Sequence, residues 1–580
     1  MEGKQTGRQQ GFLKGAAILL GALALVKVAG ALFKIPLNGI IGDVGMGYFG
    51  TAYTIYNPIF CLATAGFPVA ISRMVSERSA LGRWGDVVRI QKLALPLFIL
   101  MGAIGFLAMF FGARPFLEWI NHEDIHALPA VWALAPAILF SVIGSVYRGY
   151  YEGLRNMTPT ALSQILEAVV KLLLGLSLAW YVLDKGMEDY VNDGEIWGIA
   201  FSAESAAKEF LIPYAAAGAI LGVTVGSFLS FLFLWCYNRV HHKGIAGGVQ
   251  LVASSSSSSG SILKELLKTA IPVALGSLTV NLSSLVDTVS LQNCISGMMR
   301  MYPEAIIGQY GAFLNPADLE QNRVPAALFG CYTNALTLFM LVPALTQAFG
   351  VSALPNVTAA WVSGDKRRLQ KSIENVLRAS VLFTLPAGLC LSVLSEPIAS
   401  LLGFNPITGR ILVLLGIASV FAAISTPVCS MLQAVGRMDL PVKLMGVGLI
   451  IKTACNWFLT SLPEVNVLGA GIGTLVCYFF LTFVGLYLLI ANSGVKLRLG
   501  RVFAKPFAAA VLCAFGGFVV YQALVFKASS LAAALASLAT AAGIWGVSVI
   551  LLRIFSKSEV ERFPGGQKIA KILENHRWIR

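Results

Sequence analysis

The sequence predicts an all-α polytopic membrane protein with 14 transmembrane helices. Three observations lead to this prediction: the length of its apolar stretches, the scarcity of charge and the placement of the cations. Of 580 residues, 57% are hydrophobic and 12% are charged, whereas a soluble domain carries about 25% charged residues. A helix needs ~20 apolar residues to cross a bilayer core of ~30 Å. These stretches are too long and too uniformly apolar for barrel strands, so we expect them to cross as helices.

The apolar stretches follow one another along the whole chain. The first half contains stretches at 12–33, 46–72, 91–112, 128–147, 159–183 and 210–236. The second half contains stretches at 266–292, 326–354, 377–396, 410–434, 441–461, 467–492, 503–525 and 529–552. The short basic segment before the first stretch is not followed by a small-residue cleavage site, so we expect a retained helix rather than a signal peptide.

Positive charge falls on every second connection between these stretches. The second connection, for example, contains Arg73, Arg78, Arg83, Arg89 and Lys92, whereas the fifth is rich in Asp and Glu. Basic connections stay in the cytoplasm, so an even number of crossings places both termini there. The net charge of +14 is explained by this distribution, and nucleic acid is not an expected partner.

An internal repeat divides the chain. Arg155 and Pro159 in GLRNMTP recur 282 positions later as Arg437 and Pro441 in VGRMDLP. The repeat predicts two six-helix halves with the same orientation, related by a pseudo-two-fold axis along the membrane normal. The predicted domains are an N-terminal half (1–237), a cytoplasmic linker with a serine run (238–265), a C-terminal half (266–492), and two final helices with a basic cytoplasmic tail (493–580).

Charged residues within the spans are the candidate site residues, because a charge at mid-bilayer costs ~2.5–3.5 kcal/mol on insertion scales. Lys27 and Lys34 lie seven residues apart on one helical face. Lys171 follows Glu167 by four residues, so either the two form an ion pair or one of them faces a central cavity. Lys452 is the counterpart of Lys171 in the second half.

Asp287 is an acidic residue within an apolar stretch, with no cation near it in the sequence. A lone membrane carboxylate titrates, binds a cation or pairs across helices. Asn456 and Thr474 could add oxygen ligands, so these three residues form a candidate ion-coupling set for Na⁺ or H⁺.

We expect neither an enzyme nor a bound cofactor. The sequence has no Walker A motif and no GxSxG. The nine cysteines show no CxxC spacing, so we interpret them as small core residues. His241 and His242 are adjacent in a connection and we expect them to be solvated, so no metal site is predicted.

These features resemble the polysaccharide flippase branch of the multidrug/oligosaccharidyl-lipid/polysaccharide exporter superfamily. The resemblance covers nearly the whole chain and is carried by VAGALFKIPLNGIIGDVGMGYFGTAYTIYNPIFCLATAGFPVAIS, LVPALTQAFGVSALPNV and LQAVGRMDLPVK. The chain is most similar to the stage V sporulation protein B group and to MurJ-type lipid II flippases. In such proteins basic residues of the first helix line the cavity, and Lys27 and Lys34 stand in that stretch. The arginine that helix 2 often supplies is replaced here by Asn57, Phe60 and Cys61.

The resemblance implies a flippase in the bacterial inner membrane. It would move a lipid-linked oligosaccharide with a polyprenyl diphosphate across the membrane by alternating access, with Asp287, Asn456 and Thr474 as an implied Na⁺ site. Membrane lipids would hold the tail near the last two helices, and cell-wall synthesis proteins are further candidate partners. Two alternatives remain: a Na⁺- or H⁺-coupled multidrug exporter, and a non-transporting scaffold of a cell-wall or spore-cortex synthesis complex. The sequence does not separate a vegetative from a sporulation role.

Overall fold

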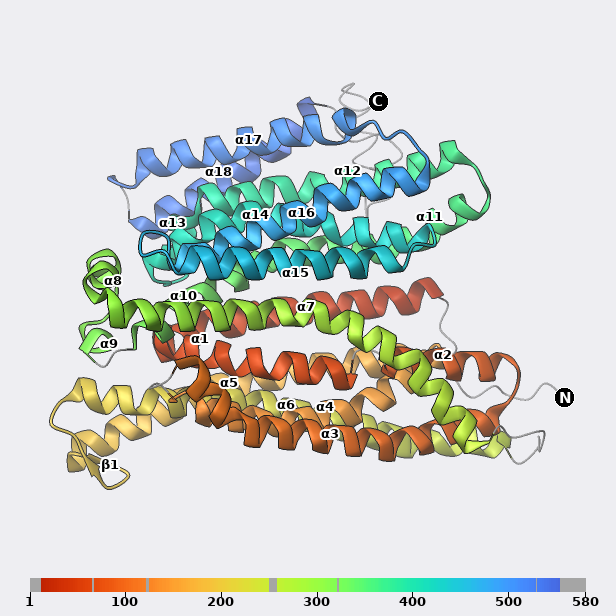
Figure 1. Cartoon of the computed structure of the whole chain (residues 1–580), viewed down its shortest axis with the longest axis horizontal. Helices are drawn as coiled ribbons and strands as arrows, with labels where there is room; N and C mark the ends of the chain where they lie inside the picture. The colour runs from red at the N-terminus through yellow and green to blue at the C-terminus, as the bar shows by residue number, and fades with distance from the viewer. Residues whose placement is uncertain are drawn as a thin grey trace. The chain divides into compact units, whose positions relative to one another are not determined.

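The computed structural model describes residues 12–64, 67–121, 125–249, 258–320, 323–527 and 529–552. The chain forms two compact units, unit 1 (Met1–Thr333) and unit 2 (Asn334–Arg580). Among the described residues the fold is helical apart from one two-stranded antiparallel sheet (Figure 1).

Among the described residues, unit 1 has six helices of 26 residues or more, together with shorter helices and the small sheet. The elements of unit 1 are α1 (Phe12–Thr64), α2 (Phe67–Ala80), α3 (Trp84–Asn121), α4 (Leu128–Gly153), α5 (Thr158–Asp193), β1 (Glu195–Ile196), β2 (Ile199–Ala200), α6 (Glu204–Val249), α7 (Ser259–Met301), α8 (Pro303–Tyr310), the 3₁₀ turn Gly311–Phe313 and α9 (Pro316–Glu320). Helix α10 (Val324–Phe339) contains the boundary between the units.

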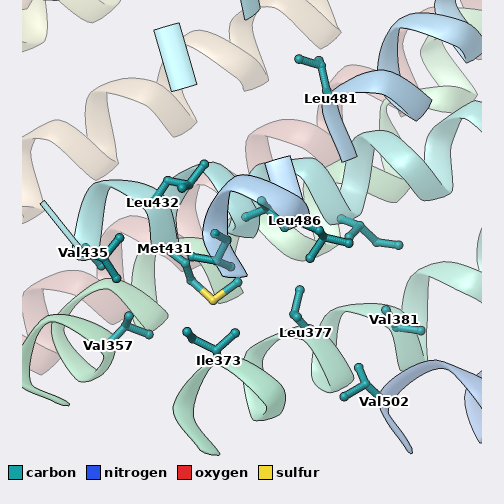
Figure 2. Packing of buried hydrophobic residues seen from close by; sticks show 14 of the residues in the cluster. Val357, Ile373, Leu377, Val381, Met431, Leu432, Val435, Leu481, Leu486 and Val502 are labelled. Atoms are coloured by element: carbon teal, nitrogen blue, oxygen red, sulfur yellow. The ribbon is translucent and has the colours of Figure 1, made fainter. Parts of the chain in front are cut away.

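Unit 2 continues with the remaining helices. They are α11 (Leu341–Val362), α12 (Lys366–Val393), α13 (Ser395–Leu401), α14 (Pro406–Ala434), α15 (Asp439–Thr460), α16 (Val467–Ser493), α17 (Leu499–Leu524) and α18 (Ser530–Leu551). Its core is built from aliphatic side chains of α12, α14, α16 and α17 (Figure 2). Leu377 of α12 and Met431 of α14 are fully buried there. In a bilayer such contacts stabilise the unit through close van der Waals packing, because lipid tails are as apolar as the side chains themselves.

Helix α1 is a hairpin of two limbs rather than one rod. Gly42 interrupts its 53 residues with φ 67° and ψ −174°, a conformation that glycine adopts at little cost because it has no Cβ. In a straight helix Phe33 and Phe49 would lie about 24 Å apart, yet their ring centroids are 5.9 Å apart. The two limbs therefore run antiparallel (Figure 1), in agreement with the separate spans predicted at 12–33 and 46–72.

Helices α5 and α6 meet along a seam of glycines. Gly218, Gly222 and Gly226 recur every fourth residue on α6 and share one face. A Cβ at Gly226 would lie 2.9 Å from the carbonyl oxygen of Glu167, and a Cβ at Gly222 would overlap the backbone of Gly175. Small residues at this spacing let helix backbones approach closely in membranes. The seam fixes the part of α5 that carries Glu167 and the residues around it.

Helix α4 meets α2 in a similar way. Gly149 and Gly153 stand four residues apart, and a Cβ at either position would lie 2.7 Å from a carbonyl oxygen of α2, that of Pro68 or Ser72. Close approach at both positions ties α2 to the C-terminal end of α4.

The internal repeat is visible in the turns between helices. Gly82 and Gly364, 282 positions apart, follow α2 and α11 with φ of 71° and 69°. Arg155 and Gly436, with φ of 59° and 84°, occupy the same place in the α4–α5 and α14–α15 turns. In both of these turns three successive N–H groups, from Leu154 and from Val435 onward, donate to carbonyls four, three and five residues earlier. Arg155 therefore corresponds to Gly436 rather than to Arg437, so the predicted spacing of 282 is wrong by one residue at this turn.

The helices match the predicted spans but not their number. Twelve helices of the described chain are long and apolar enough to cross a membrane. The first, Gly21–Ser79, includes most of both limbs of α1, and α7 is not among the twelve. The predicted stretch 326–354 is two helices, α10 and α11, separated at Met340. The count of 14 therefore stays a prediction.

The predicted linker 238–265 is mostly helical. Helix α6 continues to Val249 and α7 begins at Ser259, where the Ser258 side chain caps α7 by accepting from the N–H of Ser261 at 3.2 Å. The serines at 254–257 lie outside the described residues. Because α7 packs on α1, α2 and α3, the division into compact units falls after Thr333 rather than in the linker. The four predicted domains, and the symmetry of the halves, stay predictions.

Candidate functional site: a cationic aromatic cluster in unit 1

Two of the predicted lysines meet one group of aromatic rings in unit 1. Lys171, from α5, donates a hydrogen bond to the hydroxyl of Tyr53 at 3.1 Å. Its Nζ also lies 4.9 Å from the ring centroid of Phe33, 5.1 Å from that of Tyr53 and 6.0 Å from that of Phe49. Lys34, on the first limb of α1, has its Nζ 6.0 Å from the same Phe49 ring. Both lysines are half-buried. We call Lys34, Lys171 and these rings the cationic aromatic cluster.

The rings continue as a row along the second limb of α1. The centroids of Phe49 and Tyr53 are 4.9 Å apart, those of Tyr53 and Tyr56 are 6.0 Å apart, and those of Tyr56 and Phe60 are 5.1 Å apart. Spacings of three and four residues place these rings on one face of the helix. An ammonium over an aromatic ring gains ~0.5–2 kcal/mol. Unlike a carboxylate, a ring carries no net charge that would cancel the positive charge of Lys171, so this charge can attract an anion.

Lys27 lies on the first limb of α1, two turns before Lys34, and its side chain is exposed. It therefore shares a helical face with Lys34, as the sequence predicts, and its ammonium is accessible. The positions where the family resemblance leads us to expect an arginine carry Asn57 and Phe60, both half-buried. Phe60 stacks on Tyr56 there, so an aromatic ring occupies the place of that cation.

Glu167 does not pair with Lys171, which settles one of the two alternatives left open by the sequence. Its Oε2 accepts a hydrogen bond from Nη2 of Arg148 at 2.9 Å, and its Oε1 accepts one from the Ser227 hydroxyl at 3.1 Å. The carboxylate of Glu167 is thus engaged by another cation. Lys171, one turn further along α5, keeps a neutral hydrogen-bond acceptor, the Tyr53 hydroxyl.

Arg148 joins three helices, although it directly follows the predicted stretch 128–147 and is not among the predicted site residues. Besides Glu167 of α5, it donates to the hydroxyls of Ser163 on α5, at 3.2 Å, and Ser230 on α6, at 2.8 Å. The sequence does contain a pattern that indicates a polar contact here. Ser163 and Glu167 are four residues apart, and Ser227 and Ser230 are three apart, so each helix carries polar side chains on one face. The arginine positions the α5 segment that carries Lys171.

A ladder of polar side chains links α1 to α7 within unit 1. The hydroxyls of Thr54 and Thr288 are 2.8 Å apart, and the amide of Gln292 donates to the hydroxyl of Thr51 at 2.7 Å. Asp287, the predicted ion-coupling residue, precedes Thr288 and is 3% exposed. Asp287 is therefore a buried residue of α7 that adjoins this ladder in the sequence.

The other predicted site residues lie in unit 2. Lys452, Asn456 and Thr460 recur every fourth residue on α15 and are all buried, and Thr474 of α16 is 1% exposed. A Cβ at Gly473 would overlap the side-chain oxygen of Asn456, so α15 and α16 meet closely beside Thr474. Asn456 and Thr474 thus share one seam. Asp287 belongs to the other unit, and the ion-coupling set of three residues stays a prediction.

One end of unit 1 carries a second buried ion pair. Arg323, just before α10, lies 3.6 Å from Oε2 of Glu209 and donates to the Glu209 carbonyl at 3.3 Å. Asp318 of α9 is 6% exposed and accepts from Asn315 at 3.4 Å. Burial raises the pKa of Asp318, the contacts with Asn315 and Arg323 oppose the rise, and the nearby Asp43 adds to it. This end therefore connects α6, α9 and α10 to the Gly42 turn of α1.

No group of three His, Cys, Asp or Glu side chains with metal-binding geometry occurs among the described residues. His241 stacks on Tyr237 with ring centroids 4.0 Å apart and one ring nitrogen 3.0 Å from the Tyr237 carbonyl oxygen. The cationic aromatic cluster offers ammonium groups and aromatic rings, which suit the recognition of a negative charge.

Comparison with known proteins agrees with the helical architecture. The profile of the polysaccharide biosynthesis protein family matches residues 12–358, which include every residue of the cationic aromatic cluster. The chain belongs to the polysaccharide biosynthesis protein family. A second profile, that of the MatE family, matches residues 325–458.

Three proteins from Bacillus subtilis (strain 168) are similar to this chain over most of their length. Stage V sporulation protein B is 23% identical over 96% of this chain and 98% of its own. The lipid II flippase MurJ is 22% identical over 84% of each chain, and the membrane protein YabM is 22% identical over 97% and 96%.

Solved structures show the same fold. The inward closed conformation of lipid II flippase MurJ superposes with a TM-score of 0.60 at 14% identity, covering 92% of this chain and 98% of that one. An inward-facing multidrug resistance transporter of the MATE family superposes with a TM-score of 0.58 at 15% identity, covering 83% and 99%. The chain is thus a multi-pass membrane protein with the helical fold of these transporters.

Proposed function

We propose that this protein is a flippase, a transporter rather than an enzyme. It carries a polyprenyl-diphosphate-linked cell-wall precursor, lipid II or a related oligosaccharide, from the cytoplasmic to the outer leaflet of the bacterial inner membrane. The similarity to stage V sporulation protein B and MurJ over most of each chain supports this class of substrate. It does not decide between a vegetative and a sporulation role.

The observation that carries the proposal is the environment of the Lys171 ammonium group. Its ammonium lies between aromatic rings and donates to the neutral Tyr53 hydroxyl, while Glu167, one turn away, is held by Arg148. A positive charge of this kind, inside a membrane-spanning unit, suits a diphosphate, because hydrogen bonds between ammonium and phosphate groups are about twice as strong as neutral ones. Lys34 beside it and the exposed Lys27 would extend the positive surface along α1.

The transport cycle would follow from the two-unit organisation. The headgroup would bind the cationic aromatic cluster, and alternating access would expose it to each side in turn while the lipid tail stays in the bilayer. Both termini would lie in the cytoplasm, as the basic connections predict. An ion gradient or the membrane potential would drive the cycle, with Asp287, Asn456 and Thr474 as the candidate Na⁺ or H⁺ residues and Lys452 as a second-unit cation.

The test is complementation in a bacterium whose own lipid II flippase can be switched off, with lipid II in the outer leaflet assayed in parallel. We expect the wild-type protein to restore growth and lipid II exposure. Lys171→Ala should abolish both, and Lys171→Arg should retain partial activity because it keeps the charge. Lys185→Ala is the matched control, because Lys185 is an exposed lysine of the same helix that pairs with Glu188 at 3.0 Å. Full rescue by Lys171→Ala, at normal membrane levels, would contradict the assignment.

The match of the MatE profile to residues 325–458 favours one second candidate, a cation-coupled multidrug exporter. Drug efflux from cells that express the wild-type protein separates the two functions. A gain in drug resistance without restored lipid II exposure would support the exporter. Normal growth or spore formation with Lys27 and Asp287 both neutralised would instead favour a scaffold.

A further inference from the structure

Two cysteines far apart in the sequence meet in unit 2. Cys390 lies near the end of α12 and Cys513 in the middle of α17, and their sulfur atoms are 3.7 Å apart. The Cys513 thiol also donates to the carbonyl of Ala510 at 3.1 Å, which leaves its sulfur free to accept from Cys390. The sequence does not predict this pair, because 122 residues separate the two cysteines and they do not form a CxxC motif.

The seam around the pair is lined by small side chains on α17. On α17 the neighbours of Cys513 are small, and Ala509, Ala510 and Ala514 are 0–3% exposed. Small residues let two helix backbones approach closely, and a disulfide requires Cα atoms about 4.4–6.8 Å apart. Rotation about the Cα–Cβ bond of each cysteine can then bring the two sulfur atoms to bonding distance without moving the helices far.

The two thiols differ in exposure, and this gives them different chemical roles. Cys390 is half-buried, whereas Cys513 is 1% exposed. Oxidation of a thiol follows its accessibility. An oxidant arriving from the surrounding lipid would therefore reach Cys390 first, and Cys513 would be in place to resolve the product.

We propose that Cys390 and Cys513 form a redox-active dithiol that reacts with organic hydroperoxides, the class that includes oxidised lipids. The Cys390 sulfur attacks the peroxide, which gives a sulfenic acid on Cys390 and releases the corresponding alcohol. The Cys513 sulfur then attacks the sulfenic sulfur, a disulfide forms, and one water leaves with the thiol proton and the sulfenic hydroxyl group. Two electrons pass from the two thiols to the peroxide, which is reduced to alcohol and water. The disulfide is reopened by a dithiol reductant.

The bond would join the C-terminal helix pair to the rest of unit 2. Helices α17 and α18 pack on each other, and they contact the remainder of the unit mainly through α12 and α13. A disulfide between Cys390 and Cys513 would make one of these two contacts covalent. The state of the dithiol therefore sets how freely this helix pair can move.

The experiment treats the full-length protein in lipid nanodiscs with cumene hydroperoxide and then counts the free thiols by alkylation in denaturant and mass spectrometry. The reduced protein should show all nine cysteines, and the oxidised protein two fewer, with a linked peptide pair containing Cys390 and Cys513. Cys429→Ser, at a buried cysteine of α14, is the matched control and should still lose two thiols. An unchanged thiol count in the wild-type protein, or a linked pair without Cys390 and Cys513, would overturn the proposal.

Two further variants test the order of the steps. Cys513→Ser should accumulate a sulfenic acid on Cys390 that reacts with dimedone, because the resolving thiol is absent. In Cys390→Ser the Cys513 peptide should show neither thiol loss nor a dimedone adduct, because Cys513 is buried. Thiol loss in Cys390→Ser equal to that of the wild-type protein would contradict the assigned roles, and a thermal scan of each variant confirms that it is folded.

Discussion

The glycine seam between α5 and α6 predicts that a side chain at Gly222 is destabilising in proportion to its size. A Cβ there would overlap Gly175 and lie 3.0 Å from the backbone carbon of Leu174, whereas ordinary contact begins at 3.4 Å. Optimal carbon contacts are ~3.5–4.0 Å, so the helices must separate by on the order of 1 Å. The perturbations to compare are Gly222→Ala and Gly222→Val.

The magnitude follows from two opposing effects. Inserting methyl groups into a close-packed interface costs ~1–3 kcal/mol, and a gap of 0.5–1 Å along the seam forfeits about a quarter to a half of each van der Waals contact. Replacing glycine by alanine within a helix returns ~1 kcal/mol. We therefore expect Gly222→Ala to lower the free energy of unfolding by about 1 kcal/mol and Gly222→Val by about 3 kcal/mol.

The assay is reversible unfolding in mixed detergent micelles, followed by helical circular dichroism. Gly112→Ala and Gly112→Val in α3 are matched controls, because a Cβ at Gly112 meets nothing within 4 Å. The controls should lose little stability, and the alanine variant should gain some. If Gly222→Val unfolds within ~0.5 kcal/mol of Gly112→Val, the ordinary range for surface substitutions, the seam does not hold the two helices together and the reasoning is refuted. Since the seam positions Lys171, we also expect Gly222→Val to reduce complementation.

Two other predictions concern charged groups. Arg148→Met should destabilise the protein by about 2 kcal/mol, below the ~3–5 kcal/mol of a fully buried pair, because the two side chains are 18% and 29% exposed. Adding Glu167→Met should recover part of this loss, and a double-mutant cycle in which the two effects simply add would contradict the pairing. At Asp318 burial raises the pKa above the ordinary value of 3.8. The folded state therefore holds this proton to higher pH than the unfolded state does, and the corresponding stability is lost as pH rises from 3.8 through the raised pKa. Asp318→Asn should flatten this part of the stability profile, and a variant profile parallel to that of the wild type would rule out the Asp318 contribution.

The sequence predicts the helices well because the bilayer imposes a length and an apolar composition on each span. It also identifies Lys34 and Lys171 as site residues, because their cost inside a membrane makes them unusual at any position. The convergence of these two lysines on the rings of α1 follows only from the hairpin at Gly42. The partner of Glu167 is another case, since the i,i+4 spacing favours Lys171, and only the packing of α4 against α5 and α6 brings Arg148 closer.

Contacts between distant segments account for what the sequence does not predict. In the sequence, Cys390 and Cys513 are indistinguishable from other small apolar residues of the helices. Only the packing of α17 on α12 brings them together. The helical part of the predicted linker was missed because glycines and polar residues near His241 are typical of loops, whereas α6 continues through them. The predicted ion-coupling set also depends on contacts between distant segments. Asn456 and Thr474 share a seam, but no periodicity in the sequence connects them with Asp287.

The turn at Gly42 has a consequence for how this region of the chain can vary in length. One residue reverses the direction of α1, so no loop is available to absorb an insertion or a deletion. Each residue added to either limb would rotate everything beyond it by ~100° and advance it by ~1.5 Å, which would turn Phe49 and Tyr53 away from Lys171. Point substitutions along the limbs can therefore be tolerated, but changes in length between Lys34 and Tyr53 should be selected against in any library of variants. The number of residues between Lys34 and Tyr53 therefore fixes how the side chains of the cluster are oriented toward one another.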